Sequence, residues 1–299
     1  MQIDKENENV MYNDEKHLYI EKSSGKKCIS VTTLIEQYGQ PFDATFWSSL
    51  KAFESLVPAE DFAKIKKQLY ARKSFNTDLL RQYCVEVVEF DKKRTEILDA
   101  WKQKNKEACD RGTAIHKIHE DAAKAGNAEA VVRLGFGGVI PCRTDNLIVP
   151  KEDGIYPELL INYTSPDGVL RIAGQTDLAV IHGNDLYIVD YKSNAEIKKT
   201  SYYNSATKTR QMMQYPLNNI QDCNYWHYVL QLNTYAWIIL QKRPELNIKL
   251  MQLIHYNHEG KMTLYDCENR QDDIERLVKF HHSKCLREAA YEKLKPIEY

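Results

Sequence analysis

The sequence has no closely spaced cysteines. Its seven cysteines are scattered along 299 residues, and no C-x-x-C motif occurs among them. A zinc ribbon and a small disulfide-stapled fold therefore do not fit this sequence. Reduced thiols in a cytosolic type of compartment are the simplest interpretation.

Long hydrophobic runs are also missing. No apolar stretch approaches the roughly 20 residues that a membrane-spanning helix needs, and the opening residues, MQIDKENENV, are polar and acidic, unlike a secretory or transit peptide. We therefore expect no membrane partner. The expected location is the cytoplasm, of a bacterium or of a cell that hosts a phage or virus, with the nucleus and mitochondria as alternatives.

An excess of positive charge is missing as well, since 41 Lys and Arg oppose 42 Asp and Glu. This balance by itself does not indicate a nucleic-acid-binding protein. Charge is nevertheless segregated locally, because no acid occurs between Glu196 and Asp222. Tyr202 and Tyr203 in this stretch suit base stacking, and its basic residues suit phosphate contacts, although a solvated loop explains them equally well. The basic residues are Lys198, Lys199, Lys208 and Arg210.

The stretch around which the chain is organised reads GQTDLAVIHGNDLYIVDYKSN, from Gly174 to Asn194. Residues 176–181 and 186–191 are rich in β-branched, aromatic and aliphatic side chains, and turn-forming residues 182–185 separate them. This pattern predicts a β-hairpin.

Three charged side chains interrupt the apolar hairpin: Asp177, Asp190 and Lys192. Burial of an unpartnered carboxylate is costly, and pairing of the strands brings the two acids together. Two carboxylates offer the hard oxygen ligands that Mg²⁺ and Mn²⁺ prefer, and a lysine beside them can stabilise charge that develops on a phosphate. A surface hairpin with a cross-strand salt bridge is the alternative.

The rest of the pattern alternates helices and strands without repeats or a long linker. We expect one domain with a helical N-terminal part packed on it, divided into residues 1–109, an N-terminal hairpin and helical region, and residues 110–299. Apolar spacing predicts helices over residues 43–107, 113–126, 222–242 and about 270–293, and strands over 156–163, 247–256 and 261–266.

The helix expected to begin near Thr113 carries His116, His119 and Glu120 on one side, since they are three and four residues apart. The order differs from the H-E-x-x-H of zinc proteases. Alone, His116 is a packed or solvated residue, but beside two aspartates its imidazole would complete a metal site. The buried apolar stripe of this helix is expected to consist of Ala114, Ile115, Ile118 and Ala122.

Two further polar features lie on predicted apolar elements. Glu158 is an acid within the strand at 156–163, where a metal or water ligand and an edge-strand charge are both open interpretations. Gln231 and Tyr235 are four apart, hence on one face of the helix at 222–242. They would bond to a DNA phosphate or to active-site water, or they would be satisfied within the core.

Taken in order, these residues resemble the RecB-like branch of the PD-(D/E)XK nuclease superfamily, over roughly residues 110–240. The resemblance implies an α/β fold, with a central mixed β-sheet flanked by helices in a restriction-endonuclease-like core and a helical N-terminal part. The elements that carry it are His116, Glu158, the G-x-x-D that ends at Asp177, Asp190-Tyr191-Lys192, and Gln231-x-x-x-Tyr235.

The resemblance also implies roles. His116, Asp177 and Asp190 would ligate Mg²⁺ or Mn²⁺ together with the Tyr191 carbonyl, and Lys192 would be the catalytic lysine. Glu158 matches an acid often found on the preceding strand and joins the catalytic set. The expected substrate-binding residues are Gln231, Tyr235, Arg111, Lys198, Lys199, Lys208 and Arg210.

No iron–sulfur cluster is expected, because Cys267 and Cys285 stand apart where several relatives cluster three cysteines. The chain looks more similar to cluster-free relatives such as mitochondrial genome-maintenance exonucleases and phage nucleases. The implied function is a metal-dependent DNA exonuclease acting on single strands or ends in replication, recombination or repair, where other proteins of these processes are possible partners. The alternatives are an endonuclease on the same scaffold, a catalytically decayed nucleic-acid-binding module, and a zinc hydrolase using His116 and His119.

Overall fold

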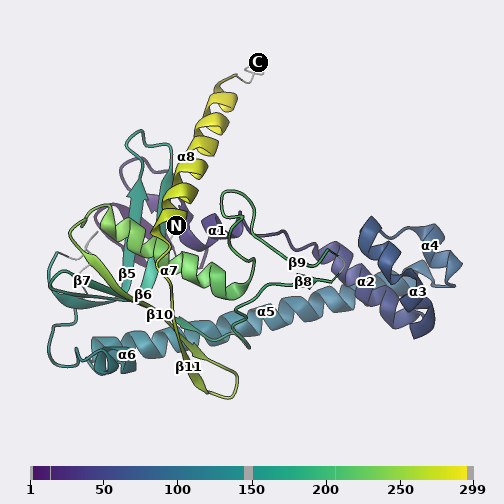
Figure 1. Ribbon diagram of the computed structural model, residues 1–299, viewed down its shortest axis with the longest axis horizontal. Coiled ribbons are helices and arrows are strands. Elements are labelled where there is room, and N and C mark those ends of the chain that lie inside the picture. The colour runs from purple at the N-terminus through teal and green to yellow at the C-terminus, as the bar shows by residue number, and fades with distance from the viewer. Residues whose placement is uncertain (1–2, 14, 145–150, 206, 295–299) are drawn as a thin grey trace. The chain divides into compact units, whose positions relative to one another are not determined.

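The computed structural model describes residues 3–13, 15–144, 151–205 and 207–294 (Figure 1). The chain divides into two compact units, one formed by Met1–Gln40 with Gly112–Tyr299 and the other by Pro41–Arg111. These units differ from the predicted division at residue 109, because four strands between Lys5 and Ser30 join the sheet of the larger unit. None of the described helices is long and apolar enough to cross a membrane.

The larger unit is built on one mixed sheet. Its strand order is β1-β2-β3-β4-β6-β7-β10-β11, and β5 also pairs with β6. The β4–β6 and β7–β10 pairs are parallel and the others antiparallel. The strands are β1 (Lys5–Glu6), β2 (Val10–Asn13), β3 (Leu18–Glu21), β4 (Lys27–Ser30), β5 (Gly154–Thr164), β6 (Arg171–His182), β7 (Asp185–Lys192), β10 (Asn247–Tyr256) and β11 (Met262–Asp266).

The central hairpin of β6 and β7 confirms the predicted one. Its two-residue turn has Gly183 at a φ of 60°, a conformation that glycine adopts without strain. Along β6, Leu178 and Val180 pack into one hydrophobic cluster, and Ala179 and Ile181 into another. The continuous apolar run is therefore explained by burial of both faces of the sheet.

Helices cover both faces (Figure 1). The cluster on one face includes α1 (Val31–Glu36), α7 (Asn224–Leu240) and α8 (Gln271–Leu294). The cluster on the other face includes the C-terminal part of α5 (Val87–Lys124) and α6 (Glu129–Arg133). The chain thus has the predicted mixed sheet flanked by helices. The basic stretch forms a separate small hairpin of β8 (Tyr203–Asn204) and β9 (Thr209–Arg210).

The smaller unit is helical, as predicted. It contains α2 (Ala44–Leu56), α3 (Ala59–Arg72), α4 (Thr77–Gln82) and the first part of α5. The Asp43 carboxylate accepts a hydrogen bond from the Phe46 N–H and so caps α2. Aromatic rings dominate its core, where Phe53 is fully buried against Phe62 and Phe75.

The prediction for the histidine-bearing helix was wrong in two respects. The helix begins at Val87 and not near Thr113, because Gly112 is accommodated inside one long helix. Only half of its predicted apolar stripe is correct: Ile115 and Ala122 pack against the core under the sheet, but Ile118 is 65% exposed and Ala114 is exposed. The face toward the sheet instead carries His116, His119 and Ala123, so polar residues take part of the buried side. The end near Gly126, which has a φ of 74°, is as predicted.

Candidate active site

The hairpin register places two acids opposite each other. Leu178 pairs with Val189, so Asp177 on β6 faces Asp190 on β7. The Asp177 carboxylate accepts a hydrogen bond from the Tyr191 backbone N–H at 2.7 Å. Both aspartates are buried, at 9% and 1% exposure. The apolar strands therefore carry two carboxylates into the interior, as the sequence predicted.

The α5 helix brings His116 to this pair. Its Nε2 lies 3.0 Å from the carbonyl oxygen of Tyr191, and its Nδ1 lies 3.4 Å from Oδ1 of Asp177. A carbonyl only accepts hydrogen bonds, so Nε2 carries a proton and Nδ1 faces the acid. A backbone bond that fixes the tautomer in this way is typical of metal-ligating histidines. The Tyr191 carbonyl, predicted as a ligand, receives the imidazole N–H in this arrangement.

Glu158 enters the site through an unusual backbone conformation. Pro157 pairs with Leu178 and Leu159 with Thr176, which places Glu158 opposite Asp177 in the register. Glu158 has a φ of 53°, in the left-handed region that non-glycine residues rarely adopt. Such strain is frequent at functional sites.

Among the described residues, one group of potential metal ligands is compact. His116, Glu158 and Asp177 each offer one donor atom, and these atoms all lie within 4.8 Å of one another. Asp190 lies outside this group. The structure thus brings together the predicted ligands His116 and Asp177 and the predicted catalytic residue Glu158.

Lys192 lies next to the group in a network that includes the helix α7. Its Nζ is 2.5 Å from Oδ2 of Asp190, 3.3 Å from Oε1 of Gln231 and 4.6 Å from the centre of the Tyr228 ring. The Gln231 amide donates to the Tyr235 hydroxyl at 2.8 Å and lies 3.4 Å from Oδ1 of Asp190. The glutamine and tyrosine of α7 therefore hold the lysine and aspartate of β7 in place.

Burial and mutual charge shift the pKa values of these groups. Burial raises the pKa of Asp177 to about 7, and the neighbouring Asp190 adds to the rise. Burial also raises the pKa of Glu158, against the opposing effect of Lys5. For His116, burial lowers the pKa, but the two aspartates outweigh it and the pKa is raised. A cluster whose acids resist ionisation in this way would gain from a bound cation.

The other two polar residues of the predicted histidine face have structural roles. The His119 ring stacks on the Tyr191 ring, with centroids 3.9 Å apart and planes within 6°. Glu120 forms an ion pair with Lys124 at 2.6 Å. This arrangement does not support a zinc site made from His116 and His119.

The predicted substrate-binding basic residues lie outside the donor group of His116, Glu158 and Asp177. Arg210 donates to the Ser201 carbonyl at 2.6 Å, and Lys199 lies over the Tyr225 ring at 5.3 Å. Lys198 is 3.8 Å from Glu196, and Lys208 is exposed. Arg111 is the last residue of the helical unit. Their contact with a substrate stays a prediction.

Three residues near the site were missed from the sequence: Lys5, Gln175 and Tyr228. Lys5 forms an ion pair with Glu158 at 3.0 Å, and Gln175 also donates to that carboxylate. For two of these three residues, the spacing in the sequence could have indicated a place near the site. Gln175 is two residues before Asp177 on the same strand face, and Tyr228 is one helical turn before Gln231. Lys5 had no such indication, because 153 residues separate it from its partner.

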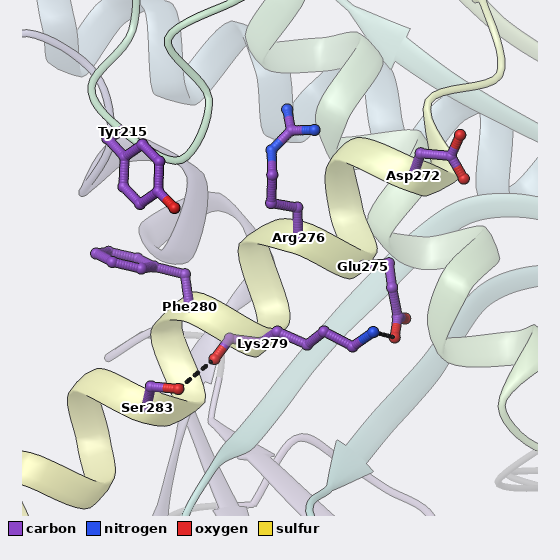
Figure 2. A pocket seen from close by; sticks show the side chains of 7 residues that line it. All are labelled: Tyr215, Asp272, Glu275, Arg276, Lys279, Phe280 and Ser283. Carbon is purple, nitrogen blue, oxygen red and sulfur yellow. Dashed lines mark hydrogen bonds and ion pairs between the residues drawn. The ribbon is translucent and has the colours of Figure 1, made fainter.

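A surface cavity of about 450 Å³ lies elsewhere, on α8 (Figure 2). Tyr215 and Phe280 meet edge to face there, with ring centroids 5.0 Å apart. The Lys279 ammonium pairs with Glu275 at 3.0 Å, and Arg276 donates to the Pro216 carbonyl. Lys279, Glu275 and Arg276 are thus engaged with neighbouring residues, and the cavity contains none of the acid cluster.

Comparison with known proteins agrees with this architecture. Residues 48–295 match the family model of the PD-(D/E)XK nuclease superfamily, and the chain belongs to this superfamily. PD-(D/E)XK nucleases use divalent metal ions, which suits the donor group of His116, Glu158 and Asp177.

Two solved structures show distant similarity. A "Putative exonuclease" from Eubacterium rectale is 11% identical, with 87% of this chain and 80% of that chain covered and a TM-score of 0.34. The protein SSO0001 is 13% identical, with 48% of this chain covered and a TM-score of 0.27. The chain spans about half the length of SSO0001, at 53%. No curated protein matches the chain.

Proposed function

We propose that the chain is a Mg²⁺- or Mn²⁺-dependent DNA exonuclease of the RecB-like branch, which hydrolyses phosphodiester bonds of single-stranded DNA or DNA ends. The observation that carries this proposal is the convergence of His116, Glu158 and Asp177, whose donor atoms lie within 4.8 Å of one another beside the Lys192 ammonium. Membership of the nuclease superfamily supports it.

The residues present fit a divalent cation. Two carboxylates and one imidazole nitrogen form a donor set that suits Mg²⁺ or Mn²⁺. Asp190, opposite Asp177, stays a proposed further ligand. When bound, the cation would polarise a phosphate oxygen and lower the pKa of a water molecule.

The lysine supplies the protein's own contribution to the chemistry. In-line attack on a phosphodiester increases the negative charge on the phosphate oxygens, and a fixed ammonium stabilises that charge. Asp190, Gln231 and the Tyr228 ring hold Lys192, so little reorganisation is needed when charge develops. Lys192 is therefore the proposed catalytic residue, with Gln231 and Tyr235 as supporting residues that also reach the substrate.

Product lengths on a gel test this proposal. End-labelled single- and double-stranded DNA and RNA would be incubated with Mg²⁺ or Mn²⁺, next to a covalently closed circular single strand. We expect mononucleotides or short products from linear DNA and no cleavage of the circle. Cleavage of the circle would show an endonuclease instead. If the chain binds DNA but hydrolyses none of these substrates with either metal ion, it is a decayed nucleic-acid-binding module.

The biological setting follows from the substrate. Single strands and free ends arise in replication, recombination and repair, and other proteins of these processes are the partners we propose besides DNA. The cytoplasm of a bacterium or of an infected host cell is the proposed location.

A further inference from the structure

The N-terminal strand is fastened beside the metal-ligand group. Asn7, which is 3% exposed, donates from Nδ2 to the carbonyl of Leu160 at 2.9 Å, two residues beyond Glu158. The same side chain accepts two backbone N–H bonds from the turn that follows it. This anchor holds β1, and with it Lys5, against β5 at the position of the strained glutamate.

Lys5 reaches from this strand to Glu158. Its Nζ is 3.0 Å from Oε2 of the carboxylate, and Gln175 donates to the same oxygen. The Lys5 side chain is 35% exposed, whereas that of Glu158 is 16% exposed. The ammonium therefore stands between a buried potential metal ligand and the solvent from which a substrate would arrive.

A bound cation would change the partner of this ammonium. Once Glu158 shares its charge with a divalent ion, the attraction on Lys5 weakens and the ion repels the ammonium. Lysine is a compact charge with three donors on a flexible stem, and an anion within reach would then be its best partner. In a nuclease that anion is a phosphate of the nucleic acid.

We propose that Lys5 is a substrate-binding residue that contacts a phosphate of the nucleic acid, and that Glu158 is its partner only while no cation is bound. This inference rests on the proposed function. It requires opposite effects of removing the ammonium: stronger binding of the cation, because a competing charge is lost, and weaker binding of the nucleic acid. A lysine that only supported the fold or oriented Glu158 would weaken both.

The chain offers a matched control. Lys22 lies in the turn between β3 and β4 and forms an ion pair with Glu6 of β1 at 2.8 Å, and its side chain is 33% exposed. Lys5→Met, Lys5→Arg and Lys22→Met would be compared with the wild-type chain by calorimetric titration with Mn²⁺ at pH 8. Affinity for a labelled single-stranded oligonucleotide in Mn²⁺ would be measured at several salt concentrations, with Lys192→Ala added to every chain so that the oligonucleotide survives.

We expect Lys5→Met to bind Mn²⁺ roughly three- to tenfold more tightly, because a like charge next to a ligand is removed. Its oligonucleotide affinity should fall about tenfold, as for the loss of a charged hydrogen bond, and the slope of log affinity against log salt should become shallower by about 0.7. Lys5→Arg should resemble the wild-type chain in both measurements, and so should Lys22→Met.

The outcomes separate the possible failures. Weaker Mn²⁺ binding by Lys5→Met would overturn the inference, as would oligonucleotide binding equal to that of Lys22→Met at every salt concentration. If the wild-type chain cleaves DNA and Lys5→Met behaves like Lys22→Met, this inference alone fails. If the wild-type chain binds neither Mn²⁺ nor the oligonucleotide, the proposed function fails and this inference fails with it.

Discussion

Gly174 leaves room for the Tyr235 ring. A Cβ atom at this glycine would lie 2.7 Å from Cε1 of Tyr235 and 3.0 Å from a methyl carbon of Val31. The glycine of the G-x-x-D motif therefore allows α7 to approach the strand that carries Asp177. Close packing at this point places the glutamine and tyrosine of α7 over the site.

We therefore predict that Gly174→Ala lowers the free energy of unfolding by about 1 to 3 kcal/mol, the usual cost of overpacking a core, and reduces nuclease activity. Urea denaturation measures the first effect. Gly112→Ala is the matched control, because a Cβ there meets only Oγ of Ser193 at an ordinary 3.6 Å, and alanine in a helix should be neutral or stabilising. Equal stability of Gly174→Ala and wild type would contradict this packing argument.

Lys192→Ala should lower the cleavage rate at least ~100-fold, the scale of losing one group that stabilises transition-state charge. Folding and oligonucleotide binding should persist, because the lysine is needed for charge that develops during the reaction. Lys249→Ala, an exposed lysine on the neighbouring strand β10, should cleave at the wild-type rate. Retained hydrolysis by a clean Lys192→Ala preparation would reject the mechanism.

The metal-free chain should lose stability as pH rises from about 4 toward about 7. Burial raises the pKa of Asp177 to about 7, so in this range the folded state holds a proton that the unfolded state has released, and unfolding becomes easier with rising pH. The raised pKa values of Glu158 and His116 act in the same direction. Thermal unfolding in chelator would measure this, and the slope should be smaller in Asp177→Asn. An equal slope in both chains would refute the assignment to Asp177.

Mn²⁺ should raise the stability of the chain, by about 2.7 kcal/mol at a concentration 100 times its dissociation constant. His116→Ala should abolish most of this gain, since it removes a donor from the group of three. His119→Phe keeps a ring to stack on Tyr191 and should retain the gain. A differential scan with and without Mn²⁺ decides this, and an unchanged Mn²⁺ effect in His116→Ala would remove this histidine from the proposed ligands.

The basic hairpin of β8 and β9 should contribute to DNA affinity without sequence preference. Lys208→Ala would remove one exposed charge from a stretch without acids, so affinity for single strands should fall and the salt slope should become shallower by about 0.7. Fluorescence anisotropy with oligonucleotides of several sequences measures both. Lys279→Ala on α8, whose ammonium pairs with Glu275, serves as the control. An unchanged affinity would exclude Lys208 from the substrate path.

Local patterns in the sequence were enough to predict the hairpin of β6 and β7, the strands β10 and β11, and the helix α7, because each has a strong local period and clear turn residues. Pairing of the two strands then places Asp177 opposite Asp190. The spacing of four residues on one helix likewise places Gln231 and Tyr235 on the same face. The relative positions within each of these two pairs are therefore set by residues that are close together in the sequence.

The way in which α5 meets the sheet, and the residues around Glu158, depend on long-range packing. The apolar pattern placed Ile115 and Ala122 correctly but not Ile118, because contact with the sheet selects the side that carries His116 and leaves this isoleucine in solvent. Glu158 joins the ligand group through a left-handed backbone, and Lys5 reaches it across 153 residues. No local pattern encodes either feature, since both arise from the packing of distant strands.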